Sequence, residues 1–197
     1  MLSESMKRFQ LAALCLLVAG TGTLTTAAEP LAVQDGTAAA TMQSVFANRL
    51  RDGGFWRQDN PEFEPGTIAP KYWMQVWSRG PGDEVVIVDA YEVRANNACT
   101  ALIHIVYRYD RETGLIKSSA FGANGMSGQG VMEFEGTVTR SDVTLQLPGG
   151  GEMRMRDRED QGSGDVVVVE VEMWDGDGWT TGESTSWKRA AHGPECE

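Results

Sequence analysis

Side chains able to perform metal or acid–base chemistry are few in this sequence. It contains two histidines, and only His104 lies inside a predicted strand. A histidine inside a barrel can bind haem iron, but His104 has no recognisable second ligand and shares its strand face with Leu102 and Arg108. We therefore expect His104 on an outer or mixed face. No Cys-x-x-Cys or His-x-x-x-His spacing occurs, so the sequence predicts no metal site and no cofactor.

Charged residues alternate with apolar ones in three segments. Paired carboxylates could perform acid–base catalysis in a pocket, and a row of arginines could hold an anionic ligand. Alternation of this kind is more typical of the solvent-facing side of a half-buried strand, where neighbouring opposite charges form surface pairs. The residues concerned are Glu133, Glu135, Glu170, Glu172, Arg154, Arg156 and Arg158.

Motifs for nucleophilic catalysis and for nucleotide binding are missing as well. None of Ser118, Ser119, Ser127 and Ser141 lies in a Gly-x-Ser-x-Gly elbow. The glycine-rich segment 122–130, which we expect to be a loop, leads into a strand and not into a helix N-terminus that could receive a phosphate. The sequence therefore predicts no catalytic residue.

Aromatic side chains are the positive signal for ligand binding. They are spread along the predicted strands; many must form the core, and some could line a cavity for a small apolar molecule. A completely filled interior would use the same residues, and the sequence does not separate the two cases. The candidate ligand-binding residues of the interior are Trp73, Trp77, Tyr91, Tyr107, Tyr109 and Phe121.

The elements that would position these side chains are mainly strands. Residues 101–109 alternate between two faces, and the turn 110–114 separates them from a second strand, 115–122. Further strands are predicted at 72–79, 84–94, 131–136, 137–147, 152–158, 165–174 and 179–189, with Phe55 and Trp56 as a short opening strand. The only predicted helix is 37–52, and 59–70 is expected to be a long loop.

Strands joined by tight turns, with no helices between them, indicate an antiparallel meander. Closure into a barrel removes exposed edges, whereas a sandwich would need longer crossings. We therefore predict an all-β protein: an antiparallel up-and-down barrel of about eight to ten strands, capped at one end by the N-terminal helix.

Residues 1–28 have the charged, apolar and small-residue order of a secretory signal peptide. Removing them takes away Glu4, Lys7 and Arg8, which leaves a single predicted domain, 29–197, with a formal charge of −12. Such acidity disfavours nucleic acid as a partner. The apolar run is too short for a permanent membrane span, and we expect an exported protein, periplasmic or secreted, without a stable membrane anchor.

A spacing near the helix resembles that of a known family. Gly54 and Trp56 have the Gly-x-Trp spacing of the first lipocalin strand, and Arg189 lies where those barrels place a basic residue over that Trp. Residues 107–114 resemble a segment of exported bacterial lipocalin-like families whose domains have no known function. The resemblance to this lipocalin-like (calycin-type) group implies a barrel, with Gly54, Trp56 and Arg189 as structural residues. It implies fold far more strongly than activity.

The predicted mature chain keeps two cysteines, Cys99 and Cys196. An even pair in an exported protein favours a disulfide, which would tie the polar C-terminal tail to the barrel rim. The alternative is two independent thiols, with Cys99 buried as a small apolar residue.

We therefore expect an exported protein that binds a small apolar or amphipathic molecule and is not an enzyme. A cofactor-free barrel enzyme, such as an isomerase or cyclase, and a filled barrel with a structural or partner-binding role are the alternatives. The ligand and the oligomeric state do not follow from the sequence.

Overall fold

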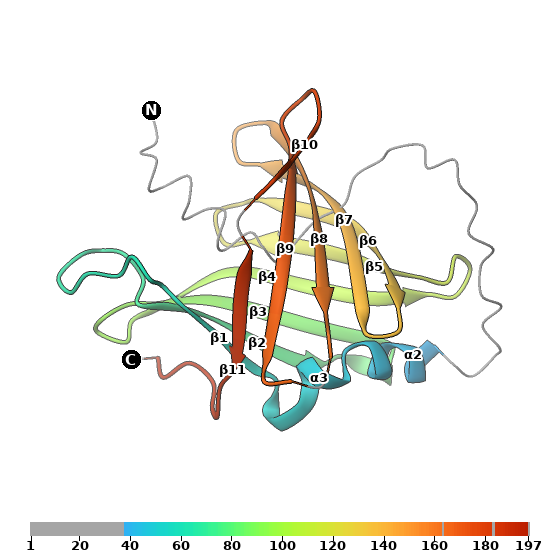
Figure 1. The fold of residues 1–197 in the computed structure, drawn as a ribbon, viewed down its shortest axis with the longest axis horizontal. Coiled ribbons are helices and arrows are strands. Elements are labelled where there is room, and N and C mark those ends of the chain that lie inside the picture. Colours follow the sequence, from blue (N-terminus) through green and yellow to red (C-terminus); the bar gives the residue numbers. More distant parts are fainter. Residues whose placement is uncertain (1–37, 163, 183, 197) are drawn as a thin grey trace.

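The computed structural model describes residues 38–162, 164–182 and 184–196. Over these residues the chain forms one continuous antiparallel sheet that curves into a barrel, with short helices at one end (Figure 1). The predicted all-β barrel is therefore confirmed. The predicted signal peptide, residues 1–28, lies outside the described residues.

Most strands pair with their neighbours in the chain, as in a meander. In chain order they are β1 (Phe55–Asp59), β2 (Tyr72–Arg79), β3 (Val85–Val93), β4 (Cys99–Asp110), β5 (Leu115–Gly122), β6 (Ser127–Glu135), β7 (Val138–Leu147), β8 (Gly151–Asp160), β9 (Val166–Trp174), β10 (Trp179–Thr181) and β11 (Thr185–Arg189).

The barrel contains ten strands, and β10 is an additional strand that pairs with β9. One predicted strand, 179–189, is divided into β10 and β11, although Gly182 still donates its N–H to the carbonyl of Val171 at 2.7 Å. Closure depends on β11, which pairs with β1 through only two residue pairs, Trp56 with Arg189 and Arg57 with Lys188.

Alternation along the strands gives the barrel an apolar interior. Along β4, Ile103, Ile105, Tyr107 and Tyr109 are buried, as the sequence pattern predicts. A β-bulge shifts the pairing of β3 with β4 between Ala90 and Tyr91. Such a bulge bends the strand that carries it and helps the sheet to curve.

The glycine-rich segment was expected to be a loop throughout, but its second half belongs to β6. The prediction for this half is wrong because Gly128 and Gly130 serve packing there and not a turn. A Cβ on Gly128 would lie 2.5 Å from the Leu145 side chain, and one on Gly130 would lie 2.0 Å from the Val143 side chain. Side chains of β7 therefore occupy the space that the two glycines leave.

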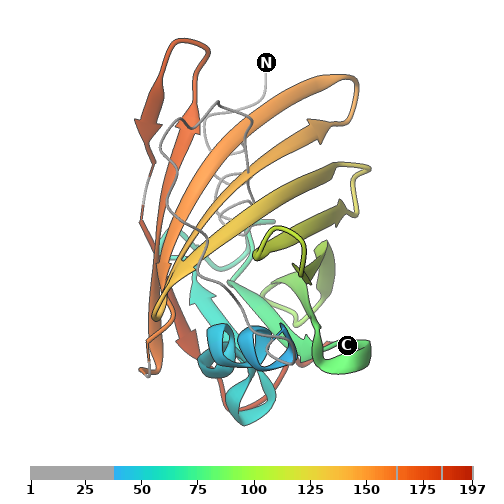
Figure 2. The same cartoon turned by 90° about the vertical axis from the view of Figure 1, so that its right-hand side faces the viewer.

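The predicted helix 37–52 is broken into α2 (Ala38–Val45), α3 (Ala47–Leu50) and the 3-10 turn η1 (Arg51–Gly53). Met42 and Phe46 are fully buried in the core, and the helices cover one end of the barrel (Figure 2). The short 3-10 turn η2 (Pro81–Asp83) lies beside α2 at this end. No helix among the described residues is long and apolar enough to cross a membrane.

The predicted disulfide between Cys99 and Cys196 is present, with the two Cα atoms 5.3 Å apart. The tail that it holds leaves β11 at the helical end, where Ala190 donates its N–H to the carbonyl of Phe55 at 2.9 Å. Ala190 then packs with Met74 on the outer face of the sheet. The bond thus fixes the C-terminal tail across the outside of the barrel.

We expect the double substitution Cys99→Ser and Cys196→Ser to lower the free energy of unfolding by about 1–3 kcal/mol. The bond closes a loop with a sequence separation of 97, for which the chain-entropy model gives roughly 4–5 kcal/mol. A terminal tail can fray without unfolding the barrel, so the realised loss should be smaller. Denaturant unfolding measures the loss. Complete alkylation of both thiols in the folded, unreduced protein would show that the bond does not form.

Candidate functional site

Most inward-facing side chains are apolar, but beneath the helices the interior wall becomes polar. On β7 and β8 the alternation continues inward with Thr139, Ser141, Asp157 and Glu159, all buried. The register pairs Ser141 with Asp157 and Thr139 with Glu159. Gln161, which follows β8 directly, is also buried. These five residues form the polar wall of the interior.

Arg49 of α3 reaches this wall from the helical cap, and its side chain is fully buried. Its Nη2 donates to Oε2 of Glu159 at 2.9 Å, and its Nε donates to Oε1 of Gln161 at 3.3 Å. The amide nitrogen of Gln161 in turn donates to Glu159 and, at 3.3 Å, to the hydroxyl of Thr139. A buried ion pair is tolerated when further hydrogen bonds complete it, as they do here for the Glu159 carboxylate.

Aromatic rings form the opposite side of this region. The guanidinium carbon of Arg49 lies 5.1 Å from the centroid of the Trp77 ring, and Tyr107 stacks on Trp77 at 5.9 Å with an interplanar angle of 6°. Phe46, which follows α2, contacts both rings. Its ring centroid lies 5.4 Å from that of Trp77 and 5.2 Å from that of Tyr107. Arg49 and the polar wall, which together form the polar cluster, are therefore covered by aromatic rings on the opposite side. The rings lower the local dielectric and strengthen the electrostatic interactions within the cluster.

Asp157 is the most perturbed acid of the cluster. Burial, and then the nearby charge of Glu159, raise its pKa to about 8, although the Ser141 hydroxyl donates to it at 2.8 Å. At neutral pH Asp157 therefore holds a proton. Burial, together with the charges of Asp157 and Glu159, also raises the pKa of Tyr107 well above its usual value. Both side chains are consequently neutral hydroxyl-bearing groups in the interior.

Two buried donors in this region have no hydrogen-bond partner in the described structure: Nη1 of Arg49 and Nε2 of Gln75. Gln75 is fully buried on β2, and its Oε1 accepts a hydrogen bond from Nε1 of Trp77 at 2.6 Å. Native proteins rarely leave buried donors unpaired, because each costs about 1–3 kcal/mol. With Arg49 and Glu159 offsetting each other and Asp157 protonated, the cluster is formally neutral and rich in donors.

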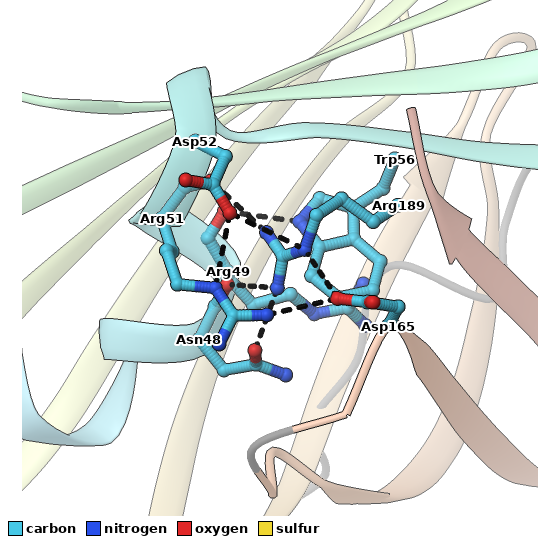
Figure 3. A network of polar contacts seen from close by, with 7 residues as sticks. All are labelled: Asn48, Arg49, Arg51, Asp52, Trp56, Asp165 and Arg189. Carbon is cyan, nitrogen blue, oxygen red and sulfur yellow. Dashed lines mark hydrogen bonds and ion pairs between the residues drawn. The ribbon is translucent and has the colours of Figure 1, made fainter. Parts of the chain in front are cut away.

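Trp56 contacts Arg49 and holds its backbone and guanidinium group in place (Figure 3). The Trp56 ring is fully buried, and its Nε1 donates to the carbonyl of Arg49 at 3.0 Å. Two guanidinium carbons contact this ring, that of Arg49 at 4.7 Å from the centroid and that of Arg189 at 4.5 Å. Arg189 also donates to Asn48 Oδ1 at 2.7 Å and to Asp165 Oδ1 at 2.9 Å. Arg189 therefore ties β11 to α3 and to the turn before β9.

Gly54 allows β1 to begin close to β2. Its φ of 74° is in the left-handed region, and a Cβ there would lie 2.0 Å from the carbonyl oxygen of Trp77. A side chain at this position would clash with backbone. Glycine is thus required where β1 enters the sheet beside Trp56.

Four of the six predicted ligand-binding residues, Trp73, Trp77, Tyr107 and Tyr109, are buried and face the interior. Trp77 and Tyr107 stack on each other opposite the polar wall. Trp73 lies further along β2, and Tyr109 lies close to the turn between β4 and β5. The sequence thus identified part of the aromatic wall but not the polar residues that it faces.

Tyr91 and Phe121 do not face the interior, and the prediction for them is wrong. Tyr91 is opposite Met74, whose side chain belongs to the outer-face cluster beneath the C-terminal tail. Phe121 is 57% exposed, while its neighbour Ala120 is buried. Successive strand residues point to opposite faces, so the residues next to the buried Ala90 and Ala120 must point outward.

His104 lies on the outer face, as expected. Its Nδ1 is 2.8 Å from Oδ1 of Asp89 on the neighbouring strand, and both side chains are partly exposed. Among the described residues there is no group of three or more histidine, cysteine, aspartate or glutamate side chains that could hold a metal ion.

The sequence did contain a signal for the residues that were missed. Asp157 and Glu159 continue an inward series that begins with Met153 and Met155, and Arg49 follows Met42 and Phe46 at helical spacing. Polar residues that occupy the apolar positions of such patterns are candidates for a buried site.

We expect Trp56→Ala to lower the free energy of unfolding by about 3–5 kcal/mol, the range for a large core aromatic. The substitution removes the surface that both guanidinium groups contact. Denaturant unfolding measures the loss, and Phe55→Ala, a change at the adjacent part-buried position, is the comparison. A loss below about 1 kcal/mol for Trp56→Ala would mean that this ring does not hold the closure together.

Asp157 should make the protein less stable as the pH rises. Its folded pKa of about 8 exceeds the unfolded value near 3.9, so the folded state binds the extra proton between these values. The stabilisation by that proton is complete below about pH 4 and is lost as the pH approaches 8. Relative to Asp157→Asn, which keeps an acceptor for Ser141, the wild type should lose on the order of 2–4 kcal/mol between pH 5 and pH 8. Parallel stability curves for the two proteins would contradict this assignment.

Comparison with known proteins adds little to the geometry. No family model matches the sequence, and no curated protein matches it. Among solved structures, the chain is similar to the crystal structure of Rv2717c from M. tuberculosis, with 14% identity over 69% of this chain and 88% of that chain, and a TM-score of 0.42. A likeness at this level carries no argument about function, and the barrel itself is established by the strand pairing.

Proposed function

We propose that this chain is an exported, lipocalin-like binding protein whose interior takes a small amphipathic molecule with an uncharged acceptor group at its polar end. The observation that carries the proposal is a pair of buried donors without a hydrogen-bond partner, Nη1 of Arg49 and Nε2 of Gln75, close to the aromatic rings that face the polar wall. A carbonyl, ester or amide oxygen of a ligand would satisfy such donors.

The charge balance of the cluster favours a neutral polar group. Glu159 already pairs with Arg49, so a carboxylate ligand would have to compete with it or add an uncompensated negative charge to a dry region. An ammonium group would add a cation beside donors that cannot accept its protons. An uncharged acceptor meets neither penalty.

The rest of the interior is rich in methionine and could therefore accommodate the apolar part of ligands that differ in shape. Met126, Met132 and Met155 are buried, and Met153 and Met173 are partly buried against the same core. Methionine is unbranched and repacks readily around different ligands. Met153 and Met173 lie near the turns at the end opposite the helices, which makes that end the expected entrance.

Export is supported by the disulfide, since such bonds persist mainly outside the reducing cytosol. The signal-like order of residues 1–28 supports the same location. The Gly54–Trp56–Arg189 arrangement supports the likeness to lipocalins, which typically have eight strands, whereas this barrel has ten.

A filled barrel without a ligand is the second candidate. It is favoured by Gly128 and Gly130, whose space is occupied by Leu145 and Val143, as in a core packed for stability. In that case the buried donors would be satisfied by ordered water.

A matched ligand series would distinguish the two candidates. We expect a long-chain methyl ketone to raise the melting temperature and to change tryptophan emission more than the alkane, carboxylate or alkylammonium of equal length. Gln75→Met should weaken ketone binding by about five- to tenfold, the worth of one hydrogen bond, and leave alkane binding unchanged. Gln146→Met, at an exposed position of β7, is the control.

Two results would contradict the proposal. If none of the four ligands changes the melting temperature or the emission, the filled barrel replaces it. If the carboxylate binds best and Gln75→Met has no effect, the polar end of the ligand is an anion held elsewhere.

A further inference from the structure

The outer face of the barrel carries a groove that the interior site does not explain. It consists of two adjoining hollows that share Val131 and together cross the strands from β4 to β9. From β5 to β9 the groove spans four strand spacings, about 19 Å. Its length suits an extended ligand better than a single small molecule.

Strand register arranges the floor of the groove in two rows. In the first row, Ser119, Gln129, Thr144 and Arg154 are consecutive partners across four strands, uncharged except for the arginine. In the second row, Asp142, Arg156 and Glu172 are consecutive partners of alternating charge. The first row thus offers hydroxyl and amide groups to a ligand. In the second row the charges of the acids and the arginine offset each other in part.

At its far end the groove reaches a pair of tryptophans on β9 and β10. Trp174 and Trp179 meet edge to face, with centroids 5.5 Å apart. The guanidinium carbon of Arg154 lies 5.2 Å from the first ring and 5.6 Å from the second, and that of Arg156 lies 3.9 Å from Trp179. The aromatic pair therefore fixes the position of two guanidinium groups.

The two arginines differ in their partners. Arg156 has carboxylates at 3.6 Å (Asp142) and 3.8 Å (Glu172). Arg154 has no ion-pair partner among the described residues, and its Nε is buried without a hydrogen-bond partner. A planar cation that is positioned by aromatic rings and lacks a counter-ion is suited to a carboxylate ligand.

The groove is also more basic than the rest of the molecule. The whole chain has a formal charge of −11, whereas the outward-facing residues that line the groove include six basic and four acidic side chains, a net +2. The basic residues are Arg108, Lys117, Arg140, Arg154, Arg156 and Arg158; the acidic ones are Glu133, Asp142, Glu170 and Glu172. A small excess of this kind suits a ligand with sparse negative charge, while the overall acidity opposes a dense polyanion.

We propose that this outer groove binds an acidic oligosaccharide, with a sugar carboxylate on Arg154. The exposed ring of Phe121 and the partly exposed tryptophan pair offer apolar surface to the faces of sugar rings at the two ends. Ser119 and Gln129 offer donors and acceptors to hydroxyl groups between them. The second hollow also touches Ser141 and Asp157 of the polar wall, but the side chains that would bind the sugar point away from the interior. The proposal therefore does not depend on the proposed interior ligand.

A galacturonate oligomer and its fully methyl-esterified form provide a matched test, because they differ in charge while sharing the same sugar chain. We expect the acidic oligomer to bind the full mature protein and to change tryptophan emission, and the ester to bind at least tenfold more weakly. Arg154→Gln should weaken binding of the acidic oligomer by about tenfold or more. Arg79→Gln, which removes an exposed arginine of β2 outside the groove, should leave it unchanged.

The proposal would be overturned if the two oligomers bind equally well or if neither binds. It would also be overturned if Arg154→Gln binds the acidic oligomer as tightly as the wild type does. Tighter binding of polyphosphate than of the galacturonate oligomer would overturn it too, because the site would then respond to charge density alone. An unchanged melting temperature shows that Arg154→Gln is folded. Methyl ketone binding by the same variant should equal that of the wild type, which separates this test from that of the interior site.

Discussion

The barrel closes at the ring of Trp56, and the rest of the molecule depends on that contact. β11 pairs with β1 through two residue pairs, and one further backbone hydrogen bond, from Ala190 to Phe55, continues this short seam. Arg189 from β11 and Arg49 from α3 both lie against the Trp56 ring, so strand closure and helix docking use the same surface. A cation beside an aromatic face contributes more when it is shielded from water, as Arg49 is here.

The same contact places a charge inside the barrel. Once Trp56 and the helical cap hold Arg49 in the interior, its charge must be compensated there, and Glu159, Gln161 and Thr139 supply the partners. Placing Asp157 two residues before Glu159 then puts two acids in one dry region, and one of them keeps its proton. The neutral, donor-rich wall of the interior is therefore a consequence of the way the barrel is closed.

The two faces of β8 show how burial changes the chemistry of similar residues. Inward, Asp157 is perturbed by desolvation and by the charge of Glu159. Outward, Arg156 and Arg158 form solvent-exposed pairs with acids on neighbouring strands, which contribute little to stability. Arg154 is the exception among the outward arginines of β8: two indole rings lie beside it, and it has no ion-pair partner among the described residues.

The sequence by itself determined the antiparallel barrel, a helical cap and the cysteine pair, because a period of two, tight turns, helical spacing and an even cysteine count are local or compositional signals, but it did not show that the cap is broken into α2, α3 and η1. It did not determine which face of each strand is the inner one, so Tyr91 and Phe121 were assigned to the interior by their aromatic character although their neighbours Ala90 and Ala120 occupy the inward positions. Nor could it show that Gly128 and Gly130 belong to a strand, since their role is to admit side chains of β7. The sequence places Arg49, Asp157 and Glu159 at inward positions of their elements, but only the tertiary structure brings them together. Arg49 and Glu159 are 110 residues apart in the chain, and only closure of the barrel brings them within 2.9 Å of each other.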